Sequence, residues 1–170
     1  MKTGLTLLAL AAFVVLATLT GCGTAVTNEP RSTSRHAADA TEALSGGIGG
    51  LIGVKGKASD SGPGVQECSG KDRDTYFRIF HKWSFYPASA SDLDAAMRHL
   101  KDGMPEHGWK IVEYGPDTSR NKNLTLVADN DEQKAGVHIT QMKKRNPPKL
   151  SLMVVSGCYR VPEGQKVEHF

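Results

Sequence analysis

The chain contains none of the short motifs that usually reveal an enzyme. It has no Gly-x-Ser-x-Gly turn, no His-Glu-x-x-His helix, no Walker phosphate loop and no Cys-x-x-Cys pair. Its six histidines show no metal-ligand spacing. The sequence therefore predicts a protein that is not an enzyme and that binds no metal or other cofactor.

The chain also lacks a strong net charge and a long hydrophobic run. Its formal charge is +3, from 21 basic and 18 acidic residues, which predicts no nucleic-acid partner. The apolar run from Leu5 to Leu19 is shorter than the roughly 20 residues of a spanning helix. No basic residue follows it between Gly23 and Asn28. The run predicts an export signal rather than a permanent membrane helix.

The signal ends in Leu19-Thr20-Gly21-Cys22. These residues resemble the lipobox of bacterial lipoproteins, in which an apolar and two small residues precede the modified cysteine. The resemblance implies that residues 1–21 are removed and that Cys22 carries diacylglycerol. Two or more acyl chains hold a protein stably on a membrane. We therefore expect a lipid-anchored protein on the extracytoplasmic face of the cell membrane; the alternative is an incidental cysteine after an ordinary signal.

The chain has only three cysteines. With Cys22 assigned to lipid, Cys68 and Cys158 remain as a pair. An exported protein meets an oxidising environment, so we expect a disulfide between them. This disulfide would close a loop of about 90 residues, which stabilises a fold by roughly 4 kcal/mol on the chain-entropy model. Two free buried thiols are the alternative.

Residues 22–67 contain no aromatic side chain and are rich in Gly, Ser, Ala and Thr. Such a composition buries too little apolar surface to offset the entropy of ordering it. The segment is predicted to be a flexible linker that holds the domain off the membrane. Its root-mean-square reach would be about 35–40 Å. A brief helix from Arg35 to Leu44 is an alternative that would change little.

Residues 68–162 are predicted to form the folded domain, followed by a tail at 163–170. Thr75–Tyr86 alternates between an apolar and a mixed face, which is typical of a long strand that ends at Pro87. Ser91 is a good helix N-cap. The helix that follows carries one apolar stripe and is ended by Gly103 and Pro105. The stripe consists of Leu93, Met97, Leu100 and Met104.

Four further strands complete the predicted domain. They are Trp109–Tyr114, Asn123–Ala128, Gly136–Met142 and Leu150–Cys158. The expected fold class is α+β, with a single helix on a mostly antiparallel five-stranded sheet in the order β-α-β-β-β-β. If the helix is a crossover, the first two strands run in the same direction and the last strand opposes the first. This arrangement places Cys68 and Cys158 at the same end of the sheet.

Three short segments stand out in the layout of the domain: Lys82-Trp83-Ser84-Phe85-Tyr86, Gly108-Trp109-Lys110-Ile111 and Ser156-Gly157-Cys158-Tyr159-Arg160. With the linker and the capped helix, they resemble small lipoproteins of actinobacteria. The similarity covers residues 68–162 and is one of pattern rather than of a catalytic motif. The resemblance supports the location and the fold and implies no activity.

Two sets of residues are candidates for a binding surface. Tyr76, Phe80 and Tyr86 share one face of the first strand and suit contacts with a sugar or a protein; packing explains them equally well. Lys143, Lys144, Arg145 and Lys149 form a basic hairpin tip that suits anionic lipid head groups or wall polymers. A solvated turn is the alternative. His81 and His138 lie in strands and are expected either to meet across the sheet or to be hydrogen-bonded singly.

Two functions follow from these features. The first is a non-enzymatic interaction module that binds an envelope protein or a wall polymer. The second is a small-ligand-binding lipoprotein with a pocket between helix and sheet. A single short helix leaves little room for a deep pocket, so the sequence favours the first. A cavity lined by His81, His138 and aromatic residues would favour the second.

Overall fold

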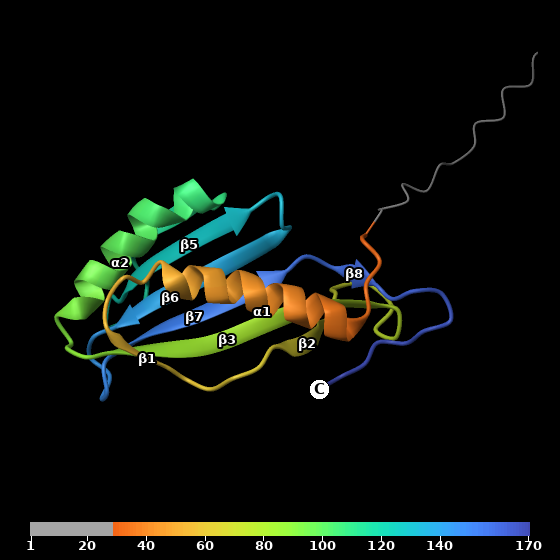
Figure 1. Ribbon diagram of the computed structural model, residues 1–170, viewed down its shortest axis with the longest axis horizontal. Helices are drawn as coiled ribbons and strands as arrows, with labels where there is room; N and C mark the ends of the chain where they lie inside the picture. The colour runs from red at the N-terminus through yellow and green to blue at the C-terminus, as the bar shows by residue number, and fades with distance from the viewer. Residues whose placement is uncertain (1–28) are drawn as a thin grey trace, which may run out of the picture.

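A computed structural model describes residues 29–170 (Figure 1). The predicted signal peptide and Cys22 lie outside the described residues. The described chain is an α+β domain in which two helices pack on a mostly antiparallel open sheet of eight strands. The elements are α1 (Ser34–Gly50), β1 (Gly56–Ala58), β2 (Gly64–Glu67), β3 (Tyr76–Pro87), α2 (Asp92–Gly103), the 3₁₀ turn η1 (Met104–His107), β4 (Lys110–Pro116), β5 (Leu124–Asn130), β6 (Ala135–Met142), β7 (Lys149–Ser156) and β8 (Tyr159–Arg160).

The sheet has the strand order β1-β3-β7-β6-β5-β4, and β2 and β8 also pair with β3. Every neighbouring pair of named strands is antiparallel. Four antiparallel steps separate β3 from β4, so these two strands run in the same direction and α2 is the crossover between them. The predicted directions of these strands are confirmed, with β7 running opposite to β3.

The predicted disulfide is also confirmed. Cys68 precedes β3 and Cys158 follows β7, so both lie at the same end of the sheet. Their sulfur atoms are bonded, and the bridge closes a sequence separation of 90 residues. We call this end of the molecule the disulfide end, and the opposite end, which carries the β4–β5 and β6–β7 turns, the far end.

Both helices cover the same face of the sheet (Figure 1). The alternation predicted for β3 is confirmed, because Phe77, Ile79, His81, Trp83 and Phe85 are all buried beneath the helices. The predicted stripe on α2 is fully buried against the same core. Ser91 holds the N-cap position of α2, but its hydroxyl pairs with Ser89 Oγ at 2.8 Å instead of capping the helix.

The prediction that residues 34–67 form a flexible linker is wrong, because α1, β1 and β2 lie there. The prediction of a single helix and five strands is wrong for the same reason. Thr33 Oγ1 accepts a hydrogen bond from the His36 N–H and begins α1. The helix then packs along β3, and β1 and β2 pair with the two ends of that strand. The buried face of α1 is built largely from small side chains: Ser34, Ala37, Ala38, Thr41, Ser45 and Ile48. The small side chains let α1 approach the sheet closely, and this close approach buries the inner face of the helix without large apolar residues.

The start and the end of the described chain meet at the disulfide end. The Ser32 N–H donates to the Arg160 carbonyl, and the Arg160 N–H donates to the Pro30 carbonyl, both at 3.0 Å. The predicted tail packs beside the start of α1, where Arg35 and Glu168 form an ion pair at 2.6 Å. That hydrogen-bonded ion pair lowers the pKa of Glu168. The chain therefore enters the domain immediately beside Cys158.

Candidate functional site

The structure brings Tyr86 together with the predicted basic hairpin tip. Lys149 Nζ lies 5.8 Å from the centre of the Tyr86 ring. A shallow hollow of about 280 Å³ lies between them, and its lining residues also include Arg145, Asn146 and Pro147. The tip and this aromatic ring therefore form one continuous surface at the far end.

Lys143 belongs to the fold rather than to that surface. Its Nζ lies 2.6 Å from Asp94 Oδ1 at the start of α2, and Gln141 Nε2 donates to the same oxygen at 3.0 Å. The hydrogen bond from Lys143, followed by that from Gln141, lowers the pKa of Asp94. Lys143, although predicted as part of the basic tip, therefore holds the β6–β7 hairpin against α2.

Tyr76 and Phe80 do not join the same surface. Tyr76 lies at the disulfide end, with Lys71 Nζ 4.8 Å and the guanidinium carbon of Arg160 5.9 Å from its ring centre. Phe80 lies against β2, where its ring occupies the space that a side chain at Gly64 would need. The candidate aromatic face is thus divided among three separate neighbourhoods.

His81 and His138 do not meet, because they lie on opposite faces of the sheet. His81 is in register with Val154 and faces the helices, whereas His138 pairs with Met153 and is exposed on the other face. Of the two outcomes expected for these residues, the single hydrogen bond is the one found for His81, to the Ser61 carbonyl oxygen.

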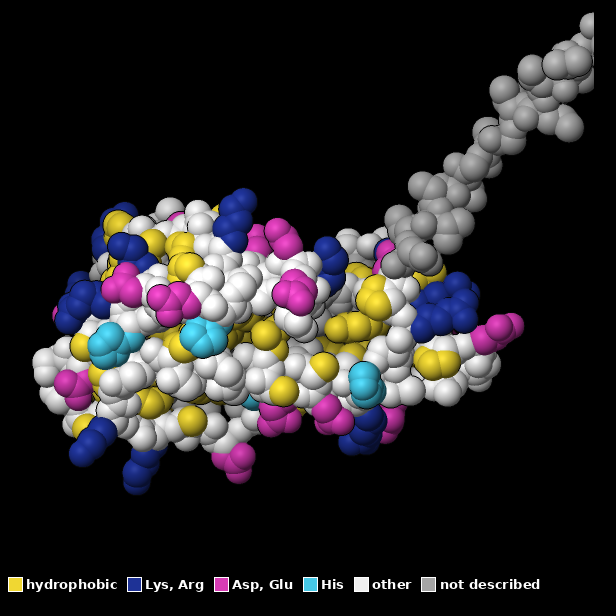
Figure 2. All heavy atoms as spheres, turned by 45° about the horizontal axis from the view of Figure 1, so that its top comes forward, with side chains coloured by type: hydrophobic (Ala, Val, Ile, Leu, Met, Phe, Trp, Pro, Cys, Tyr) yellow, Lys and Arg dark blue, Asp and Glu magenta, His cyan; other side chains and the backbone are white. Residues whose placement is uncertain are grey.

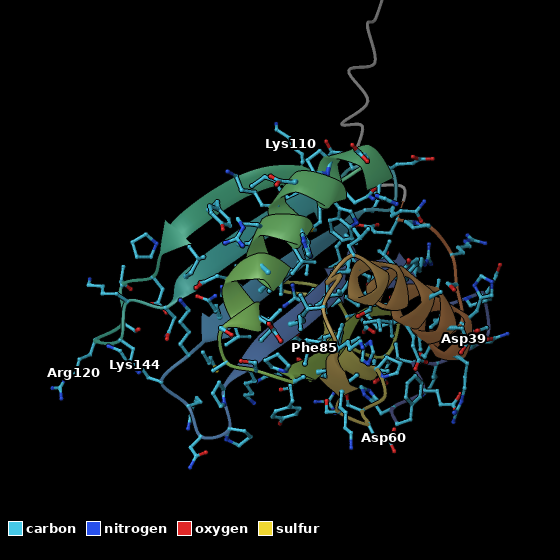
Figure 3. All side chains as sticks on the ribbon, turned by 60° about the vertical axis from the view of Figure 1, so that its left-hand side comes forward. Asp39, Asp60, Phe85, Lys110, Arg120 and Lys144 are labelled. Atoms are coloured by element: carbon cyan, nitrogen blue, oxygen red, sulfur yellow. A yellow bond between two sulfur atoms is a disulfide. The ribbon has the colours of Figure 1, made fainter. Side chains whose placement is uncertain are left out.

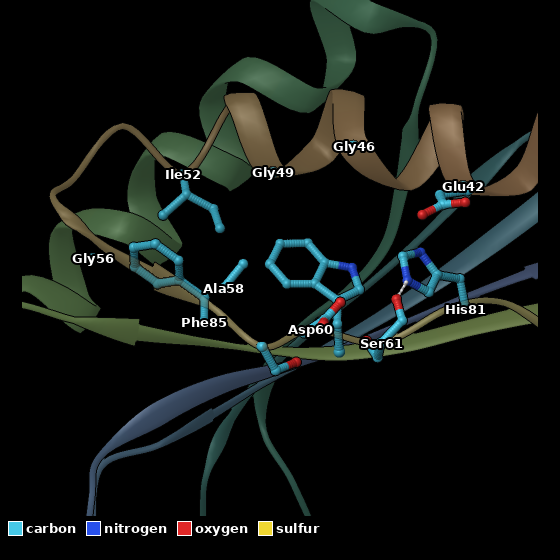
Figure 4. A pocket seen from close by; sticks show the side chains of 12 residues that line it. Glu42, Gly46, Gly49, Ile52, Gly56, Ala58, Asp60, Ser61, His81 and Phe85 are labelled. Atoms are coloured by element: carbon cyan, nitrogen blue, oxygen red, sulfur yellow. Dashed lines mark hydrogen bonds between the residues drawn. The ribbon is translucent and has the colours of Figure 1, made fainter.

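A second and larger hollow than the one beside Tyr86 lies between α1 and β3 (Figure 4). Its volume is about 520 Å³, which is within the range of small-molecule sites. The segment from β1 to the β1–β2 connection forms its outer wall. The lining residues are Glu42, Gly46, Gly49, Ile52, Gly56, Ala58, Ser59, Asp60, Ser61, His81, Trp83 and Phe85. We call this hollow the α1–β3 cavity.

Glycine and serine residues of α1 shape the inner wall of the α1–β3 cavity. Trp83 Nε1 donates to Ser45 Oγ at 2.8 Å, which fixes the indole beneath the helix. A Cβ at Gly49 would lie 3.3 Å from the Trp83 ring, whereas a Cβ at Gly46 would meet nothing within 4 Å. The helix is therefore in close contact with the indole at Gly49 and leaves open space at Gly46.

His81 supplies a polar atom that has no partner. The residue is only 8% exposed, and its Nε2 lies 2.8 Å from the Ser61 carbonyl oxygen. A carbonyl only accepts hydrogen bonds, so Nε2 carries the proton and Nδ1 is an acceptor in the neutral ring. Nδ1 is buried without a hydrogen-bond partner, as is Ser61 Oγ. Buried polar atoms without partners are uncommon and call for an explanation.

The charged residues that line the α1–β3 cavity are both acidic. Glu42 comes from α1 and Asp60 from the β1–β2 connection, and both are exposed at its rim. Figure 4 shows the Glu42 carboxylate above the Nδ1 side of the His81 ring. No Lys or Arg is among the described lining residues. The site therefore joins an apolar, aromatic floor to an acidic rim.

No group of three His, Cys, Asp or Glu side chains within residues 29–170 could hold a metal ion. No helix in this part of the chain is long and apolar enough to cross a membrane. Comparison with known proteins finds no match: no family model, no curated protein and no solved structure is significantly similar to this chain.

Proposed function

We propose that this chain is a lipid-anchored protein of the extracytoplasmic membrane face whose domain binds a small molecule in the α1–β3 cavity. The observation that carries the proposal is the unpartnered Nδ1 of His81 in a hollow with an aromatic floor. The argument against a pocket assumed a single helix, and α1 removes that assumption. Binding is favoured over catalysis because His81 Nδ1, the basic nitrogen of this tautomer, makes no hydrogen bond to the Ser61 hydroxyl or to any other described nucleophile.

The test uses two glycines that are neighbours on α1. A Cβ at either position would meet nothing within 4 Å, but only Gly46 lines the α1–β3 cavity, so Gly46→Leu places a side chain there and Gly47→Leu does not. Both changes raise helix propensity by up to about 1 kcal/mol. We expect the neutral dye N-phenyl-1-naphthylamine to bind and fluoresce with the wild type and Gly47→Leu. Its affinity should fall at least tenfold with Gly46→Leu.

Equal binding to both variants would place the dye elsewhere and contradict the proposal. Thermal unfolding of each variant serves as the control for folding. Both variants should gain the same helix propensity, so their melting temperatures should be similar. A dye that binds neither the wild type nor either variant would also contradict the proposed site.

The anchor rests on the lipobox resemblance and has its own prediction. Cys22→Ala should move the protein from the membrane fraction to the soluble fraction, because lipid chains are the proposed source of attachment. Membrane fractionation followed by immunoblotting measures this. A Cys22→Ala protein that stays in the membrane fraction at the normal level would contradict the anchor. Thr24→Ala is the matched control, because it changes a residue next to the lipobox while keeping Cys22 and the Cys68–Cys158 bridge.

The entry of the chain beside Cys158 changes the expected geometry of the anchor. Because residues 30–32 are bound to β8, the chain between Cys22 and Pro30 spans at most about 28 Å. The disulfide end would therefore lie close to the membrane, and the domain would be held less far away than a linker to residue 67 would allow. The far end would point away from the lipid.

A second candidate function is the interaction module, and the far end favours it. The β4–β5 turn carries Arg120 and Lys122, and the β6–β7 turn carries Lys144 and Arg145, all exposed. Figure 3 shows Arg120 and Lys144 at the same end of the domain, and Figure 2 shows Lys and Arg side chains on that end with some Asp and Glu among them. This surface suits an anionic wall polymer or an acidic envelope protein better than the lipid of its own membrane.

A further inference from the structure

We infer that the ligand of the α1–β3 cavity carries a protonated amine on an apolar, ring-bearing body. This inference rests on the proposed function, since it assigns the chemistry of the same cavity. It comes from the chemical character of the groups that three separate elements bring to one hollow: α1, β3 and the β1–β2 connection.

The charged and imidazole groups of the site are all hydrogen-bond acceptors. Glu42 and Asp60 carry carboxylates, and His81 offers its unpartnered Nδ1. A ligand that satisfies the three must donate, and an ammonium group has three N–H donors. Among the other polar side chains of the lining, the hydroxyls of Ser59 and Ser61 can act as donor or acceptor. Ser59 Oγ already accepts a hydrogen bond from the Ser84 N–H. The arrangement matches a cationic donor.

His81 is the observation that distinguishes this site from a cluster of surface acids. The ring is more than nine-tenths buried and held by the Ser61 carbonyl, so its Nδ1 has a fixed position. Nδ1 has no partner within the described protein. A ligand N–H that reaches it would satisfy a buried atom whose desolvation is otherwise uncompensated.

The apolar part of the site favours the same ligand. Trp83 and Phe85 line the α1–β3 cavity together with Ile52. Aromatic faces attract a cation within about 6 Å and also bury an apolar ring. An anionic ligand would instead meet two carboxylates with no basic residue among the described lining side chains. The affinity of the site should therefore be highest for a cationic ligand, lower for a neutral one and lowest for an anionic one.

Three probes with one indole body test this ranking. Tryptamine is a cation, tryptophol is neutral and indole-3-acetate is an anion at pH 7.5. We expect calorimetry on residues 29–170 to give tryptamine an affinity at least about tenfold above tryptophol. Indole-3-acetate should bind most weakly. Raising the salt concentration should weaken tryptamine more than tryptophol, because rim charges are screened.

Two double variants separate a local effect from a change in net charge. Glu42→Gln with Asp60→Asn should lower tryptamine affinity about tenfold and leave tryptophol within about twofold. Asp131→Asn with Glu132→Gln makes the same chemical changes on the exposed β5–β6 turn and should alter neither. All four residues are exposed, so the fold should be unaffected.

The two proposals fail in different ways. If tryptophol or indole-3-acetate binds as tightly as tryptamine, and Gly46→Leu still removes the binding, the amine inference is overturned and the cavity remains a ligand site. If Gly46→Leu leaves tryptamine binding unchanged, the α1–β3 cavity is not the site and both proposals are overturned.

Discussion

A chain shortened to residues 62–170 should fail to fold cooperatively, although it keeps β2–β8 and α2. It lacks α1 and β1, and therefore lacks Ile48 and Ile52, which are 1% and 2% exposed. Burying one such side chain contributes about 1.5–3 kcal/mol. The deletion also exposes Trp83 and Phe85, so the total loss approaches the 5–15 kcal/mol that small domains typically have.

Circular dichroism during heating is the measurement, with residues 29–170 as the reference. The longer chain should unfold in one sharp transition, and the shorter one should give a broad or absent transition. Ile48→Ala in the longer chain is the graded control, with an expected loss of about 2–5 kcal/mol. A shortened chain that melts sharply within a few degrees of the reference would show that α1 is dispensable.

The sequence predicted α2 and the central strands correctly because their side chains carry strong local patterns. The alternation of β3 was predicted at Thr75–Tyr86 and is found at Tyr76–Pro87. The α2 stripe and the Cys68–Cys158 bridge were also predicted. In each case a large apolar residue or a cysteine marks the buried position, so a short window of sequence contains the signal.

The sequence indicated α1 only as a brief alternative, from Arg35 to Leu44, because the buried positions of this helix are marked by size rather than by hydrophobicity. Ala37, Thr41 and Ser45 line its buried face, and the helix ends in a run rich in glycine. Each glycine costs about 1 kcal/mol of helix propensity. The helix is stabilised instead by packing on β3 and by the Ser45–Trp83 hydrogen bond. These contacts link residues 38 positions apart in the sequence, which no local pattern reveals.

The candidate cavity was missed for the same reason. One wall consists of residues that composition assigns to a linker, and the other consists of β3. His81 was singled out with His138, but whether two strand residues share a face depends on the register of every strand between them. The spacing of the small residues at 37, 41 and 45, followed by Ile48, is the one signal that could have indicated a helix packed closely on a sheet.

The second large effect is expected from the disulfide. Replacing Cys68 and Cys158 together by alanine should lower the free energy of unfolding by about 4–5 kcal/mol, because the bridge spans 90 residues. For a domain of this size the melting temperature should fall by roughly 10–20 °C. Heating with circular dichroism measures the shift, and wild type treated with a reducing agent should reproduce it.

The position of the bridge indicates that this loss will affect the whole domain rather than one frayed end. Cys68 follows β2 and Cys158 precedes β8, and both strands pair with β3, the strand that also carries α1. Residues 30–32 bind β8 at the same place. Opening the bridge therefore loosens both ends of the chain where they hold the central strand. If amide exchange of the double variant increased only in residues 64–76 and 157–162, with an unchanged melting temperature, the bridge would act locally and this account of the fold would be wrong.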